Sequence, residues 1–183
     1  ATRPEDMIRS RYTDWLASVE DGYHLLSGVA PRVYLAGLSM GGVLSLLAAS
    51  YLPVRGVIAM ATPYNLPEDW RVRHTGLLSR IQPYMPKSKE PPGAGWFDAE
   101  AWKEHISYPQ NPVRSIGELK QLLDAMRAAL PKVTVPVLLV YSKNDHYLPL
   151  GSLNSMNYIY EHVGTTDRQK VVVERSGHVL TRD

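Results

Sequence analysis

Residues 32–52 constrain the fold of this chain most, because they place a sharp glycine-rich turn between two apolar segments. Their sequence is RVYLAGLSMGGVLSLLAASYL. Val33–Ala36 predicts a buried strand, and a helix is expected to begin near Met40. The turn between them, Gly37–Gly41, fits G-x-S-x-G, a pattern that holds a serine on a strained strand-to-helix turn with its hydroxyl exposed. Chance alone gives about 0.06 such patterns in a chain of this length.

Both glycines of this turn are expected to be required. A side chain at Gly37 or Gly41 would collide where backbone segments approach closely. The N-terminus of the following helix directs N–H groups toward any negative charge that develops beside Ser39. The simpler alternative is an ordinary glycine-rich turn with a bystander serine, and the structural context must decide between them.

Composition limits the class of protein. A chain of 183 residues with 44% apolar content can form one core, so we expect one domain with an insertion. The net charge of +2, from scattered Lys and Arg, indicates no nucleic-acid partner. The absence of cysteine excludes a disulfide scaffold and a thiol nucleophile. Without a membrane-length apolar run or a signal peptide in residues 1–30, the sequence favours a cytoplasmic protein with no stable membrane anchor.

Regular elements alternate along the chain. Residues 2–28 are expected to be mostly one helix that ends at Gly28, with Thr2 and Glu5 as a capping box. A second strand after the helix at Met40 would complete a βαβ unit and hence a parallel sheet. The further predicted strands are 54–62, 135–141 and 170–173, and a helix is predicted over 151–163.

The segment from Pro63 to Pro131 differs in character, since it holds nine of the fourteen prolines. This density predicts short helices joined by turns, lying over one edge of the sheet. The exception is 115–130, where Ser115 and Glu118 suggest a capping box. Its aromatic residues either form a small core of the insertion or line an apolar acyl pocket. They are Trp70, Trp96, Phe97 and Trp102.

Three reactive residue types each follow a different predicted strand, and so should meet at the carboxyl edge of the sheet. They are Ser39, Asp145 and His178. A serine hydroxyl needs a base to become a nucleophile, and imidazole has a suitable ordinary pKa. A carboxylate would hold the ring in one tautomer and stabilise the imidazolium.

Other histidines and acids compete for these roles. His146 could line the mouth of the site, and Asp183 is a possible substitute for Asp145, although no strand precedes it. The remaining histidines lie in predicted helices or in the insertion. They are His24, His74, His105 and His162.

Three runs in the sequence carry a resemblance. LAGLSMGG, VPVLLVYSKNDHYLP and ERSGHVLTRD resemble bacterial carboxylesterases related to monoacylglycerol lipases, in the α/β-hydrolase superfamily. The resemblance implies a mostly parallel sheet with helices on both faces. It divides the chain into a core (1–63 and 132–183) and a helical cap (64–131).

The same resemblance implies a chemistry. Ser39 would be the nucleophile, His178 the base and Asp145 the orienting acid, with the N–H of Met40 as half of an oxyanion hole. Substrates would be short- or medium-chain acyl esters or monoacylglycerols, with no cofactor and no metal. The residues expected to contact substrate are Leu38, Trp70, Trp96, Trp102 and His146.

Two features of that family have no counterpart here. Before the helix with which this chain begins, the family has several strands and an H-G loop that donates the second oxyanion N–H. After the catalytic histidine, here His178, the family has a last helix. We therefore expect an internal part of a hydrolase, or a chain whose remainder is supplied elsewhere, with an open sheet edge that permits self-association. The alternatives are a thioesterase or acyltransferase using the same residues, or an impaired fragment that only binds a ligand or partner.

Overall fold

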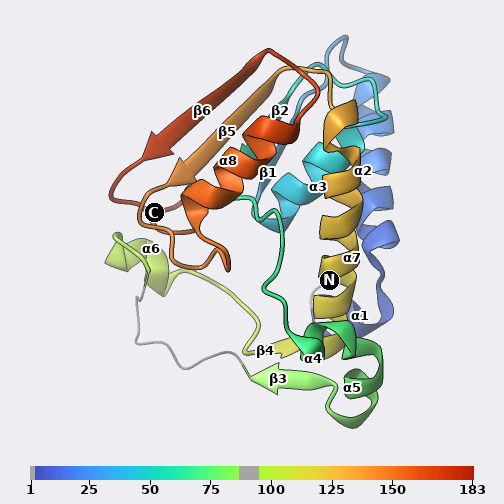
Figure 1. Cartoon of the computed structure of the whole chain (residues 1–183), viewed down its shortest axis with the longest axis vertical. Helices are drawn as coiled ribbons and strands as arrows, with labels where there is room; N and C mark the ends of the chain where they lie inside the picture. Colours follow the sequence, from blue (N-terminus) through green and yellow to red (C-terminus); the bar gives the residue numbers. More distant parts are fainter. Residues whose placement is uncertain (1–2, 87–94) are drawn as a thin grey trace.

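The structure is a computed structural model that describes residues 3–86 and 95–183. Its centre is a four-stranded sheet that is parallel, as predicted, with the strand order β1-β2-β5-β6 (Figure 1). The strands are β1 (Leu35–Leu38), β2 (Val57–Met60), β5 (Val137–Ser142) and β6 (Arg168–Val173). Strand β1 begins two residues later than predicted, although the Val33 carbonyl already accepts the Arg55 N–H at 2.8 Å.

The connecting helices form one layer on the sheet. They are α3 (Met40–Ala49), α7 (Val113–Ala129) with its 3₁₀ extension η1 (Leu130–Lys132), and α8 (Ser152–His162). All three crossovers run in the same direction across the sheet, so right-handed connections place these helices on the same face. Their buried side chains, Leu46, Leu122, Met126 and Ile159 among them, form the core with the inward residues of β2 and β5.

Burial alternates along the two central strands. Val57 and Ala59 are buried in β2, whereas Ile58 and Met60 on the opposite face are half-buried, and β5 begins in the same way. Helices were predicted on both faces of the sheet. Within residues 3–86 and 95–183, the connecting helices cover one face. In these ranges β1 pairs with β2 alone, and self-association through its free edge stays a prediction.

The N-terminal segment is two helices rather than the predicted single one. Helix α1 (Pro4–Arg9) ends at Ser10, whose backbone is extended, and α2 (Tyr12–Ser27) then runs to Gly28 as predicted. A capping box is present at the start of α1, but the predicted residues, Thr2 and Glu5, were wrong. The Asp6 carboxylate accepts the Arg3 N–H at 3.3 Å, and Thr2 lies outside the described residues.

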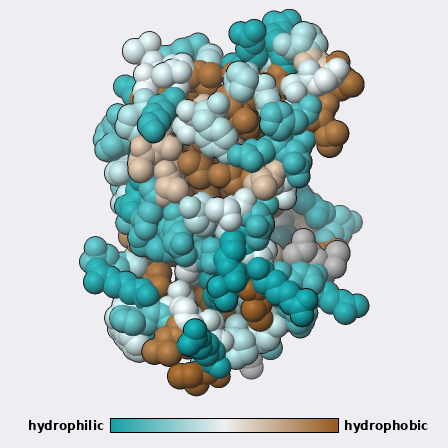
Figure 2. All heavy atoms as spheres, turned by 90° about the vertical axis from the view of Figure 1, so that its right-hand side faces the viewer, coloured by the Kyte–Doolittle hydropathy of each residue, from teal (hydrophilic) through white to brown (hydrophobic). Residues whose placement is uncertain are grey.

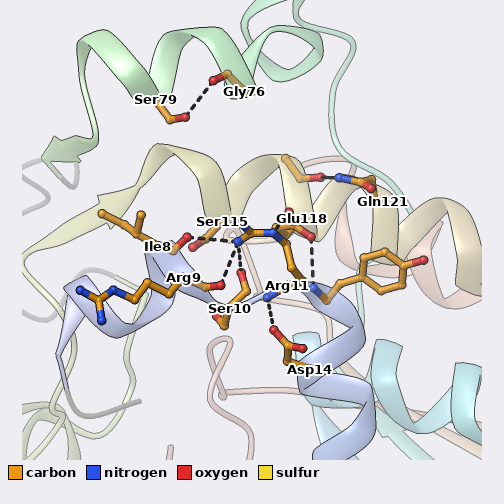
Figure 3. A network of polar contacts seen from close by, with 12 residues as sticks. Ile8, Arg9, Ser10, Arg11, Asp14, Gly76, Ser79, Ser115, Glu118 and Gln121 are labelled. Atoms are coloured by element: carbon orange, nitrogen blue, oxygen red, sulfur yellow. Dashed lines mark hydrogen bonds and ion pairs between the residues drawn. The ribbon is translucent and has the colours of Figure 1, made fainter.

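A partly buried network of polar contacts at Arg11 explains this break (Figure 3). The Arg11 guanidinium donates to the carbonyls of Ile8, Arg9 and Ser10 at 3.0–3.2 Å, which satisfies the end of α1. Glu118 of α7, which is 6% exposed, accepts the Tyr12 N–H at 3.1 Å and lies 3.6 Å from Arg11. The bend thus lets α1 and α2 pack on α7.

The long helix of the insertion begins earlier than predicted. Helix α7 begins at Val113, after Pro112, rather than at Ser115. The Ser115 hydroxyl donates to the Met7 carbonyl at 3.3 Å, and Glu118 binds Tyr12, so the two residues do not form a capping box. Both side chains instead connect α7 to the N-terminal helices, more than 100 residues earlier in the chain.

The rest of the insertion consists of short elements, as its prolines predict. They are α4 (Trp70–Arg73), α5 (Thr75–Ile81), β3 (Tyr84–Pro86), α6 (Ala99–Lys103) and β4 (Gln110–Pro112), with β3 and β4 paired antiparallel. Figure 2 shows apolar side chains on the surface at the lower end of the molecule, where α5 lies in Figure 1. Leu77 and Ile81 of α5 are 59% and 79% exposed.

Candidate active site

Ser39 lies in a strained turn between β1 and α3. Its backbone has φ 53° and ψ −119°, a conformation that costs a non-glycine residue on the order of 1–3 kcal/mol. The Ser39 N–H donates to the Met60 carbonyl of β2 at 2.8 Å, and its own carbonyl accepts the Gly42 N–H at 3.0 Å. These bonds fix the strained residue at the carboxyl edge of the sheet, as the turn pattern predicts.

The glycines around the turn do not all have the predicted role. A Cβ at Gly37 would lie 2.1 Å from the carbonyl group of Gly41, so this prediction is confirmed. At Gly41 a Cβ would meet nothing within 4 Å, and the expected collision there was wrong. The second tight position is Gly42, where a Cβ would lie 1.9 Å from Oγ1 of Thr62.

This difference predicts opposite effects of two matched variants. Gly37→Ala forces the strand and the helix apart and should destabilise the chain by about 3 kcal/mol or more. Gly41→Ala has room for its methyl group inside a helix and should be neutral or stabilising by up to about 1 kcal/mol. Urea denaturation followed by circular dichroism measures both, and equal destabilisation by the two variants would contradict the packing described here.

A second strained turn supports the elbow from the next strand. Ala61, after β2, has φ 43°. Beside it, the buried hydroxyl of Tyr141 donates to the Thr62 carbonyl at 2.7 Å. Burial raises the pKa of Tyr141, so the phenol remains a donor. This bond joins the ends of β2 and β5, as the bond from Ser39 to Met60 joins those of β1 and β2.

Asp145 and His178 meet at this edge, as the sequence predicts for loops after β5 and β6. Nδ1 of His178 lies 2.8 Å from Oδ2 of Asp145. The Asp145 side chain is fully buried, whereas that of His178 is 19% exposed. The second Asp145 oxygen accepts the Tyr147 N–H at 2.8 Å. One carboxylate oxygen is thus occupied by the backbone, and the other is free to orient the imidazole.

Side chains that the sequence reasoning missed hold these two loops together. The Ser142 hydroxyl donates to the Ser176 carbonyl and accepts the Asn144 N–H. Oδ1 of Asn144 accepts the N–H of Arg175, whose φ is 59°. Ser142 and Asn144 are small polar residues just before Asp145, and that position was the only signal in the sequence.

The Ser39 hydroxyl is not hydrogen-bonded to His178 in the structure, and it makes no hydrogen bond to another side chain in the described ranges. Catalytic hydrogen bonds are often long or poorly aligned before substrate binds. Met40 is the first residue of α3, so its N–H has no acceptor within the helix and can serve a ligand.

The predicted substrate contacts lie in different parts of the molecule. Leu38, the last residue of β1, is half-buried next to Ser39, and His146 is exposed next to Asp145. Trp96 and Trp102 are half-buried in the segment around α6, which Figure 1 places beside the ends of β5 and β6. Trp70 is 65% exposed on α4, beside α7 and apart from α6 (Figure 1).

The described residues hold neither a candidate metal site nor a helix that could span a membrane. No group of three or more His, Asp or Glu within residues 3–86 and 95–183 could hold a metal ion. In the same ranges, no helix has the length and apolar character that crossing a membrane requires.

Two sequence relatives match almost the whole chain. The chain is 28% identical to a carboxylesterase of Bacillus subtilis over 98% of its length, and 29% identical to a thermostable monoacylglycerol lipase of Bacillus sp. over all of it. It spans 70% and 69% of these two proteins.

Solved structures show the same fold. A structure from the study of LipS and LipT, two metagenome-derived lipolytic enzymes, has a TM-score of 0.82 at 25% identity, over 100% of this chain and 71% of that one. A monoacylglycerol lipase of Paleococcus ferrophilus has a TM-score of 0.74 at 16% identity, over 92% and 67% of the two chains. The alpha/beta hydrolase family matches residues 2–183, and the chain belongs to that family.

Proposed function

We propose that this chain carries the catalytic residues of a serine hydrolase that cleaves carboxylic esters. The observation that supports the proposal is the 2.8 Å contact between His178 and Asp145, at the sheet edge that also holds Ser39 in its strained turn. Serine in that turn, rather than aspartate, favours acyl transfer over the dehalogenase and epoxide hydrolase chemistry of relatives that carry aspartate there. The two sequence relatives are named as a carboxylesterase and a monoacylglycerol lipase, which favours ester substrates.

Acylation would begin with Ser39. As its hydroxyl attacks the ester carbonyl, Nε2 of His178 takes the proton, and the developing imidazolium is stabilised by Asp145 through Nδ1. The negative charge on the carbonyl oxygen is met by the N–H of Met40 at the start of α3. Collapse of the tetrahedral intermediate transfers the proton from His178 to the leaving alcohol and leaves an acyl group on Ser39.

Deacylation repeats these steps with water. His178 removes a proton from the attacking water, and the carboxylic acid is released as Ser39 recovers its proton. Each proton taken by the imidazole is returned within the same cycle, so water is the only co-reactant. Short- or medium-chain acyl esters and monoacylglycerols are the proposed substrates, and Leu38, Trp96, Trp102 and His146 are the proposed contacts nearest the site, with Trp70 farther away.

Stopped-flow hydrolysis of p-nitrophenyl butyrate tests this proposal. An acyl-enzyme mechanism gives a burst of p-nitrophenol of about one equivalent per chain when deacylation is slow. A fluorophosphonate should add covalently to Ser39, as located by peptide mass spectrometry. Turnover of a butyryl thioester with no turnover of oxygen esters would favour the thioesterase alternative. The absence of both burst and labelling would reject the proposed chemistry for this chain.

A further inference from the structure

We propose that Asp183 is a positioning residue: its carboxylate fastens the cap segment Gly95–Asp98 to the loop Arg175–His178, and thereby holds His178 against Asp145. The role of His178 rests on the proposed function. The fastening itself rests only on contacts between residues that the structure describes. This role differs from the one considered in the sequence analysis, where Asp183 was a possible substitute for Asp145.

The Asp183 carboxylate binds three backbone N–H groups from two distant parts of the chain. Oδ1 accepts the N–H groups of Phe97 and Asp98, each at 2.7 Å, and Oδ2 accepts that of Gly177, the residue before His178. Hydrogen bonds from N–H groups to a carboxylate are roughly twice as strong as those between neutral groups. One side chain therefore joins segments 80 residues apart at the base-bearing loop.

The two joined segments also pack closely against each other beside this carboxylate. A Cβ at Gly177 would lie 1.7 Å from the Gly95 carbonyl oxygen, so the two backbones are in direct contact. Gly95 itself has φ 76°, and a Cβ there would lie 2.7 Å from the Tyr147 ring. That ring lies 5.8 Å from the ring of His178, measured between centroids.

The Asp183 backbone fixes its own position relative to the base. Its N–H donates to the Val179 carbonyl at 3.1 Å, which closes a turn directly after His178. Asp145 contacts the imidazole at Nδ1, and Asp183 binds the backbone of the residues before and after His178, Gly177 and Val179. Because a displacement of about 1 Å in a catalytic group can cost on the order of 100-fold in rate, this clamp should affect turnover.

The test compares Asp183→Ala, Asp183→Asn and Arg182→Gln in the whole chain. Arg182→Gln is the matched control, because it breaks only the exposed ion pair with Glu104, at 2.9 Å, and leaves the carboxylate in place. In Asp183→Ala we expect the exchange protection of the Phe97, Asp98 and Gly177 amides to fall about tenfold or more. We also expect kcat for p-nitrophenyl butyrate to fall about 10- to 100-fold, with KM changed less than threefold.

Asp183→Asn retains one acceptor oxygen and should lie between wild type and Asp183→Ala in both measurements. Rates are to be expressed per chain that reacts with a fluorophosphonate, so that a loss of folded protein does not count as a loss of turnover. Unchanged kcat per reactive chain in Asp183→Ala, with only a lower melting temperature, would overturn the positioning role.

The exchange measurement does not depend on catalysis. If wild type were not labelled at Ser39, the proposed function would fail, while the three amides would still report on the fastening. Their unchanged protection in Asp183→Ala overturns the inference with or without activity, and a loss confined to the two joined segments supports it.

Discussion

Ser39→Ala is expected to lower kcat for p-nitrophenyl butyrate by roughly 10⁶-fold and to abolish covalent labelling by a fluorophosphonate. This is the size of the loss when the serine of a comparable Ser-His-Asp site is removed. The alanine methyl group occupies the place of the serine Cβ, so the strained backbone and its bond to Met60 are unchanged. The melting temperature should therefore stay close to that of wild type.

Two further serine variants isolate the cause of that loss. Ser18→Ala removes an exposed hydroxyl on α2 that bonds only the Asp14 carbonyl, and should leave both rate and labelling unchanged. Ser39→Gly also lacks the nucleophile, but it relieves the backbone strain at φ 53° and should unfold about 1–3 kcal/mol less readily than Ser39→Ala. Labelling that persists in Ser39→Ala would assign the nucleophile to another residue.

The candidate site could be predicted because its signals are local. The turn at Ser39 lies within five consecutive residues, and Asp145 and His178 each follow a strand that its own apolar run identifies. A parallel sheet then brings the ends of those strands to one edge. Knowledge of the complete tertiary structure was not needed to propose that Asp145 and His178 meet.

The features that were missed depend on contacts between distant segments. The sequence around Ser10 shows no sign that the helix of residues 2–28 is interrupted. The interruption follows from contacts of Arg11 and Tyr12 with Glu118, which lies 106 residues after Tyr12. The turn pattern pointed to Gly41, but the tight position is Gly42, where Thr62 from the end of β2 and the Gly37 carbonyl lie against the helix. Asp183 follows no strand, so its three backbone partners could not be anticipated.

Asp145→Asn is the second large effect that we expect, a loss of about 10⁴-fold in kcat. The carboxylate accepts two donors, the Tyr147 N–H at Oδ1 and Nδ1 of His178 at Oδ2. An asparagine offers one oxygen and one NH₂ group, so it must oppose one of these donors. If its NH₂ group faces His178, Nδ1 becomes the acceptor and Nε2 carries the proton, which is the wrong tautomer for a base acting on Ser39.

The matched control is Asp21→Asn, which removes a carboxylate from an exposed position on α2 and should leave the rate unchanged. The tautomer can be observed directly from the ¹⁵N chemical shifts of the His178 ring. With aspartate at 145 we expect the proton on Nδ1, and with asparagine we expect it on Nε2. A loss of less than tenfold, with the tautomer unchanged, would mean that Asp145 does not orient the base. The asparagine must face one buried donor with its NH₂ group, so the melting temperature of the variant is measured beside the rate to separate loss of folding from loss of turnover.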